Sequence, residues 1–113
     1  MHELSIATNI IEIATEYAEK NNASVIKEIE IEIGELSGVV VEALEFAMES
    51  ATKDTLLENA KISINYIPGR AKCLNCRNEF PVASLYETCP ECNTFNPEII
   101  KGNELRIKSL IID

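Results

Sequence analysis

Four cysteines stand in two closely spaced pairs, and their type and spacing are those of metal ligands. The sequence reads Cys73-Leu-Asn-Cys76, then twelve residues, then Cys89-Pro-Glu-Cys92. Each C-x-x-C pair can form a tight turn, called a knuckle here, that presents two sulfurs to one ion. Two knuckles complete the tetrahedral set of four thiolates that Zn²⁺ prefers. Because four thiolates close the coordination shell and leave no place for a water nucleophile, we expect a structural Zn²⁺ site.

Two other chemistries remain open for these cysteines. A rubredoxin-like iron site uses the same tetrahedral set of sulfurs. Disulfide bonds are less favoured, because we expect a cytoplasmic protein with reduced thiols. This expectation rests on the start of the chain, where Glu3, Glu12 and Glu16 interrupt any apolar stretch of the kind a signal peptide needs. A segment of about thirty residues has too small a core to fold without a staple, so metal binding would supply its folding free energy.

A second candidate metal site is the Met-His-Glu sequence at the start, where His2 is the only histidine. The amine of Met1, the amide nitrogen of His2 and the imidazole Nδ1 can close around one ion in two fused chelate rings. The amide must lose its proton, which Ni²⁺ and Cu²⁺ enforce near neutral pH, and a nitrogen-rich planar set suits these two ions. One position stays open for Glu3, water or another protein. Glu3 also has an ordinary explanation, because acids in the first turn of a helix complement its dipole.

The rest of the sequence predicts the elements that must position these residues. Apolar residues recur at helical spacing from Leu4 to about Asn21, and a second helix is predicted roughly from Val40 to Thr52. Three segments alternate apolar and polar residues as strands do, at residues 26–34, 61–67 and 104–112. In the first of these strands, three isoleucines would be buried and Glu28, Glu30 and Glu32 would face water. The other positions expected to be buried are Leu4, Ala7, Ile10, Ile11, Ala14, Tyr17, Ala18, Val40, Leu44, Ala47, Met48, Ala51, Ile62, Ile64, Tyr66, Leu105 and Ile107.

This order of elements predicts an α+β fold with two helices on a three-stranded sheet and an inserted four-cysteine zinc-ribbon module. The composition changes at Ala71, where the cysteine-rich segment begins, and a strand pattern returns after Gly102. We therefore predict an α+β domain made of residues 1–70 and 102–113. Residues 71–101 would form the zinc-ribbon domain.

Charge and motif content narrow the possible functions. Nineteen acidic and ten basic side chains give a formal net charge of −9, which favours cations and basic protein surfaces. Because nucleic-acid binding depends on Lys and Arg, and Arg77 is the only basic residue between Cys73 and Cys92, we expect no nucleic-acid partner. No apolar run approaches the roughly 18 residues of a membrane span. The sequence also lacks a phosphate-binding loop and an obvious nucleophile–base pair, so we expect no enzymatic activity.

Four blocks of sequence stand in order along the chain: MHELSIA, IGELSGVVVEALEFAMES, the paired C-x-x-C module and GNELRIKSLIID. Over essentially its whole length, the chain resembles the HypA/HybF family of [NiFe]-hydrogenase maturation proteins. The resemblance implies an α+β nickel-binding domain, a zinc-ribbon domain and delivery of Ni²⁺ to the hydrogenase large subunit together with the GTPase HypB. Some bacterial members also serve urease, so urease accessory proteins are further candidate partners.

The resemblance also implies which residues bind each metal. By position, the nickel ligands are Met1, His2 and Glu3, and the zinc ligands are Cys73, Cys76, Cys89 and Cys92. The chain departs from the family at Arg77 and Asn93, where glycine often follows each C-x-x-C pair. Arg accepts left-handed backbone less readily than Asn, so we expect mild strain or a shifted turn at the first knuckle. Some relatives carry a histidine in the zinc module that can reach the nickel, and this chain has none.

The leading hypothesis is therefore a nickel metallochaperone with a structural zinc site. The competing hypothesis is a zinc-ribbon adaptor that binds another protein and transports no metal. The sequence leaves open whether the protein is a monomer or a homodimer.

Overall fold

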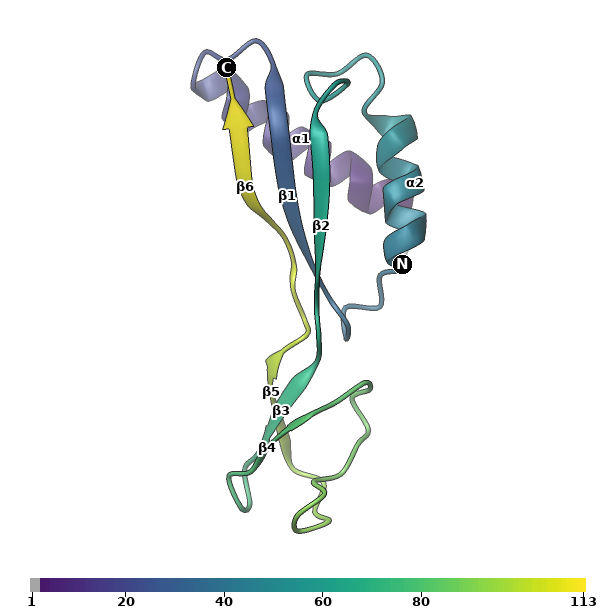
Figure 1. The fold of residues 1–113 in the computed structure, drawn as a ribbon, viewed down its shortest axis with the longest axis vertical. Helices are drawn as coiled ribbons and strands as arrows, with labels where there is room; N and C mark the ends of the chain where they lie inside the picture. Colours follow the sequence, from purple (N-terminus) through teal and green to yellow (C-terminus); the bar gives the residue numbers. More distant parts are fainter. Residues whose placement is uncertain (1–2) are drawn as a thin grey trace.

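The computed structural model describes residues 3–113 and shows an elongated molecule with two small sheets placed end to end (Figure 1). The larger unit contains α1 (Glu3–Lys20), β1 (Ile26–Gly34), α2 (Val41–Ala51), β2 (Lys61–Ile67) and β6 (Leu105–Ile112). The smaller unit contains β3 (Arg70–Cys73), β4 (Glu79–Pro81) and β5 (Pro97–Lys101). The predicted α+β class is confirmed, and each predicted helix and strand differs from its observed bounds by at most one residue at either end.

The larger sheet has the order β2-β1-β6, with β1 in the centre. β2 runs parallel to β1 and β6 runs antiparallel to it. A parallel pair needs a crossover connection, and α2 with its loops supplies it. The isoleucines of β1 are buried against both helices, as their alternation predicted. The fully packed core consists of Ala7, Ile10, Ile11, Ala14, Ala18, Ile26, Ile29, Ile31, Ile33, Val39, Leu44, Ala47, Met48 and Leu57.

Five residues that were expected in this core are exposed instead, and one of them is Leu105, which is 37% exposed at the start of the edge strand β6. Leu4 and Tyr17 of α1 are 59% and 50% exposed, and they lie at the margins of the buried stripe, whose centre is filled by small alanines and isoleucines. Val40, at 59%, precedes the first turn of α2 and so does not share its buried face. Tyr66, at 53%, lies on the edge strand β2. Periodicity defines the centre of a buried face better than its margins.

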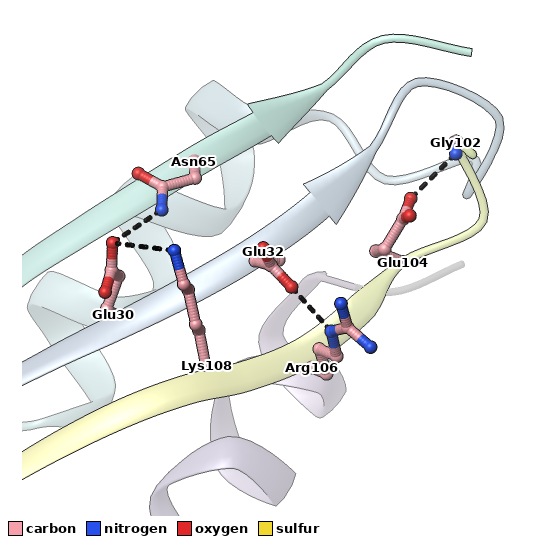
Figure 2. Close-up of polar contacts among 7 residues, drawn as sticks. All are labelled: Glu30, Glu32, Asn65, Gly102, Glu104, Arg106 and Lys108. Atoms are coloured by element: carbon pink, nitrogen blue, oxygen red, sulfur yellow. Dashed lines mark hydrogen bonds and ion pairs between the residues drawn. The ribbon is translucent and has the colours of Figure 1, made fainter. Parts of the chain in front are cut away.

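Glu30 and Glu32 of β1 face away from the helices, and side chains of the neighbouring strands contact their carboxylates (Figure 2). Glu32 accepts a hydrogen bond from Arg106 Nε at 2.5 Å and is only 9% exposed, so the expectation that it faces water is wrong. Glu30 accepts hydrogen bonds from Asn65 Nδ2 at 2.6 Å and Ser109 Oγ at 3.1 Å. The bond from Asn65, with smaller effects from Ser109 and Lys108, lowers the pKa of Glu30. These groups therefore favour the ionised form of Glu30.

Three glycines meet where the two units join. The chain crosses between the units twice, from β2 to β3 past Gly69 and from β5 to β6 past Gly102. A Cβ on Gly34 would overlap the carbonyl of Gly102, and a Cβ on Gly69 would overlap the carbonyl oxygen of Val82. Gly102 has φ of +114°, and a Cβ there would lie 2.7 Å from the Cα of Gly69. The backbones therefore pack directly on one another at this glycine junction, defined by Gly34, Gly69 and Gly102.

The loop after β1 ties both crossings together. The amide of Glu35 donates to the carbonyl of Ile67 at 2.8 Å, and the amide of Leu36 donates to the carbonyl of Gly102 at 2.7 Å. The carboxylate of Glu35 accepts a hydrogen bond from the amide of Gly69 at 2.8 Å, and that of Glu104 accepts one from the amide of Gly102 at 2.7 Å (Figure 2). The side chain of Leu36 packs against the core of the smaller unit. One loop thus contacts both crossings and both units.

Replacing Gly34 by alanine should destabilise the protein, because the new methyl group would overlap the backbone of Gly102. We expect the free energy of unfolding to fall by about 3 kcal/mol, measured by urea denaturation followed by circular dichroism. Gly38→Ala is the control, since a Cβ there meets no described atom within 4 Å and only its φ of +80° is unfavourable. That variant should lose about 1 kcal/mol. Equal losses in the two variants would show that close packing at the junction is unimportant.

Candidate metal sites

The smaller unit is built around the cysteines. β3 is its central strand and pairs antiparallel with β4 on one side and β5 on the other. Cys73 is the last residue of β3, and Cys76 lies in the turn that follows it. Cys89 and Cys92 lie between β4 and β5. The buried core of this unit contains only Ala71, Cys73, Phe80, Val82 and Cys89. Because two of these five residues are cysteines, the core depends on what their sulfurs bind.

The four Sγ atoms form one compact cluster within 4.8 Å of one another. The separations are 3.6 Å between Cys73 and Cys92 and 3.6 Å between Cys76 and Cys89. A tetrahedral ion with bonds of about 2.3 Å to sulfur holds its ligands about 3.8 Å apart. A disulfide would need about 2.05 Å, and all four thiols are free. The structure therefore brings together all four predicted ligands in an arrangement that fits a metal ion and contains no disulfide bond.

Both knuckles have the same backbone geometry. The amide of Arg77 donates to the carbonyl of Cys73 at 2.7 Å, and the amide of Asn93 donates to the carbonyl of Cys89 at 2.8 Å. Arg77 has φ of 66° and Asn93 has φ of 59°, so both residues adopt left-handed backbone. Of the two outcomes expected at Arg77, the structure shows the strained residue and not a shifted turn.

Polar groups around the sulfurs favour thiolates at some positions and thiols at others. The hydroxyl of Thr94, its backbone amide and the side chain of Asn75 lower the pKa of Cys92 to about 6. The backbone of Asn78 favours the thiolate of Cys76, but lost hydration and the three neighbouring cysteines raise its pKa to about 12. Four sulfurs this close cannot all ionise without a compensating positive charge. A bound cation would supply that charge, which is why the cluster suits a metal ion.

The predicted nickel residues Met1 and His2 lie outside the described residues. Glu3, the third, is the first residue of α1. Its carboxylate accepts a hydrogen bond from the amide of Val40 at 3.4 Å, and Val40 immediately precedes α2. A carboxylate at the amino end of a helix is stabilised by the helix dipole. The structure thus places Glu3 beside the start of α2. Sequence reasoning missed this contact, because no local pattern links residues so far apart.

Comparison with known proteins decides the family. The family model described as "Hydrogenase/urease nickel incorporation, metallochaperone, hypA" matches residues 1–112. The chain belongs to the HypA family. A hydrogenase maturation factor HypA from Parabacteroides distasonis is 48% identical over 112 residues, covering 99% of this chain and 97% of the relative. Another from Geobacter sulfurreducens is 43% identical over 113 residues, covering 100% of both chains.

A solved structure agrees with this assignment. The solution structure of the Ni metallochaperone HypA from Helicobacter pylori matches with a TM-score of 0.71 and 30% identity, covering 99% of this chain and 97% of that one. HypA proteins are metallochaperones of hydrogenase maturation and not enzymes, as the sequence predicted for this chain. In residues 3–113, neither helix has the length and hydrophobicity that a membrane span requires.

Replacing Arg77 by glycine should stabilise the metal-loaded protein, because glycine accepts left-handed backbone without a Cβ clash. We expect the free energy of unfolding to rise by about 1 kcal/mol, measured by urea denaturation. Asn93→Gly is the matched control at the second knuckle, and its gain should be smaller because Asn tolerates this conformation. A destabilised Arg77→Gly variant would mean that the arginine side chain contributes more than its backbone strain costs.

Proposed function

We propose that this chain binds Ni²⁺ through Met1, His2 and Glu3 and delivers it to a maturing [NiFe]-hydrogenase. The observation that carries the proposal is the family match over residues 1–112, which includes the Met-His-Glu sequence at its start. A terminal amine, the His2 amide and its imidazole make a nitrogen-rich set that suits Ni²⁺. Glu3 follows these nitrogens directly in the sequence, and its carboxylate is the one member of the proposed site that the structure describes.

For the four-cysteine site we propose Zn²⁺ in a structural role. The sulfur spacing suits a tetrahedral ion, the four thiolates would close its coordination shell, and the core of the module is small. Iron bound by the same four cysteines is the alternative, and elemental analysis together with the visible spectrum of purified protein distinguishes the two. In this proposal, residues 71–101 form a zinc-ribbon domain and residues 1–70 with 102–113 form the nickel-binding domain.

The two sites would then differ in how readily they release their ions. The terminal chelate leaves one position for Glu3, water or a ligand of another protein, so an acceptor can attack there and remove the ion by ligand exchange. The four-thiolate site has no such opening. By family resemblance, the proposed partners are the GTPase HypB and the hydrogenase large subunit. HypB would supply any nucleotide hydrolysis, because this sequence has no phosphate-binding loop of its own. Urease accessory proteins are further proposed partners, and we place the delivery in the cytoplasm.

Two residues added ahead of Met1 should abolish most nickel binding, because the chelate would lose its terminal amine. Calorimetric titration of untagged protein with Ni²⁺ measures this, and the zinc content should not change. His2→Ala is the companion variant, which should fold normally and bind nickel poorly. An adaptor that carries no metal would be indifferent to both changes, so nickel binding that survives them would favour the adaptor hypothesis.

Nickel affinity should rise steeply with pH. An amine and an imidazole lose their protons between about pH 6 and pH 8, and an amide proton must also leave. We expect more than about a 100-fold increase in the association constant across that range, measured by titration against a competing chelator of known affinity. A flat profile would show that the terminal nitrogens are not the ligands.

A further inference from the structure

The boundary between α2 and β2 contains two hollows, which follow one another along the strand. The first, of about 320 Å³, is lined by Glu45, Glu49, Ala60, Ile62 and Ile64. The second, of about 430 Å³, is lined by Val39, Val40, Val41, Glu42 and Tyr66. Figure 1 shows α2 lying alongside β2 at this side of the sheet. We call the two hollows together the α2–β2 groove.

One wall of the groove is an unpaired strand edge. Within residues 3–113, β2 pairs only with β1, so the outer backbone groups of its seven residues have no strand partner. An exposed edge of this kind can accept an added strand through main-chain hydrogen bonds. Ile62 and Ile64 are half-buried on the helix side of this edge and give it an apolar floor. Tyr66, with 53% of its surface exposed, extends this apolar floor.

The other wall is acidic. Glu42, Glu45 and Glu49 are exposed on one side of α2, and within the described part of the chain none of them forms an ion pair. α2 has no basic residue in its last turn. Phe46, with 71% of its surface exposed, lies beside these acids. The charge of this wall selects against acidic occupants and favours basic ones.

The geometry points to a basic, extended segment of a partner protein as the occupant. We propose that such a segment adds to the free edge of β2. The methylenes of its Lys or Arg side chains would lie on Ile62 and Ile64, and their charged ends would reach Glu45 and Glu49. One end of the groove is at Val40, whose amide holds Glu3. The groove would therefore bind the nickel acceptor beside the terminal chelate, and this identity of the partner rests on the proposed function.

A second apolar groove runs between α1 and β6 and includes Ile13, Tyr17 and Ile107. The basic groups of that strand, Arg106 and Lys108, already contact Glu32 and Glu30 of the same sheet. No described residue of this second groove favours one kind of binding partner over another. The α2–β2 groove differs because its acids have no partner within the described residues.

The test uses a fluorescein-labelled, capped hexapeptide of alternating arginine and valine, mixed with the full chain in its metal-loaded form at low salt. Fluorescence anisotropy should detect binding, and Glu45→Gln with Glu49→Gln should weaken it about fivefold. The matched control is Glu12→Gln with Glu16→Gln on the exposed face of α1, which removes the same charge and should leave the affinity unchanged. Equal weakening in the two double variants would reduce the effect to net charge and overturn the proposal.

Hydrogen exchange tests the strand addition itself. Among Lys61–Ile67, the alternate amides that point away from β1 should exchange more slowly when the peptide is bound, because the outer edge of β2 would then be paired. Binding without protection there, binding of an alternating glutamate–valine peptide with equal affinity, or no binding would each overturn the proposal.

Nickel titration separates the groove proposal from the proposed function. If nickel binds and the peptide does not, only the groove is wrong, whereas absent nickel binding defeats the proposed function and leaves the groove result intact.

Discussion

Close packing of three backbone segments at the glycine junction is the constraint on which the arrangement of the two units depends. Side chains cannot separate Gly34, Gly69 and Gly102, because a Cβ on any of them would overlap neighbouring backbone atoms. The loop after β1 then hydrogen-bonds to both crossings, while Leu36 packs into the smaller core. The same loop leads directly into α2. The cysteine module and the start of α2 are thus held by one short stretch of chain.

The two candidate metal sites differ in how completely their ligands would surround an ion. The cysteine cluster gathers four sulfurs at one end of a small sheet, and its compactness matches an ion that completes a core too small to be stable alone. The proposed nickel site uses groups at a chain terminus, and its one described member, Glu3, contacts the amino end of α2. A closed set of ligands favours retention of the ion, whereas a set at a chain terminus favours its exchange to another protein. This contrast agrees with the proposal of a transported nickel ion and a structural zinc ion.

Much of the fold could be predicted from local patterns. The isoleucine–glutamate alternation of β1 located the central strand, and the helical spacing of Ala7, Ile10 and Ile11 located the buried face of α1. The patterns failed where a neighbour distant in sequence decides exposure. Glu32 is covered by Arg106, which lies 74 residues away, and Tyr66 is exposed because β2 is an edge strand. The three-stranded sheet of the cysteine module was not predicted, because its strands are too short to show alternation.

The sequence by itself predicted a metal site at the four cysteines, and it determined the order of the main helices and strands and the family. The spacing of the cysteines, the periodicity of apolar residues and the family motifs all involve residues that are close together in the sequence. They can therefore be recognised without knowing the fold. Only the tertiary structure decided that Gly34 meets Gly102, that Glu3 lies beside Val40, and that an acidic helix borders the free edge of β2. Each of these contacts joins segments far apart along the chain, and their proximity depends on how the sheet and helices pack.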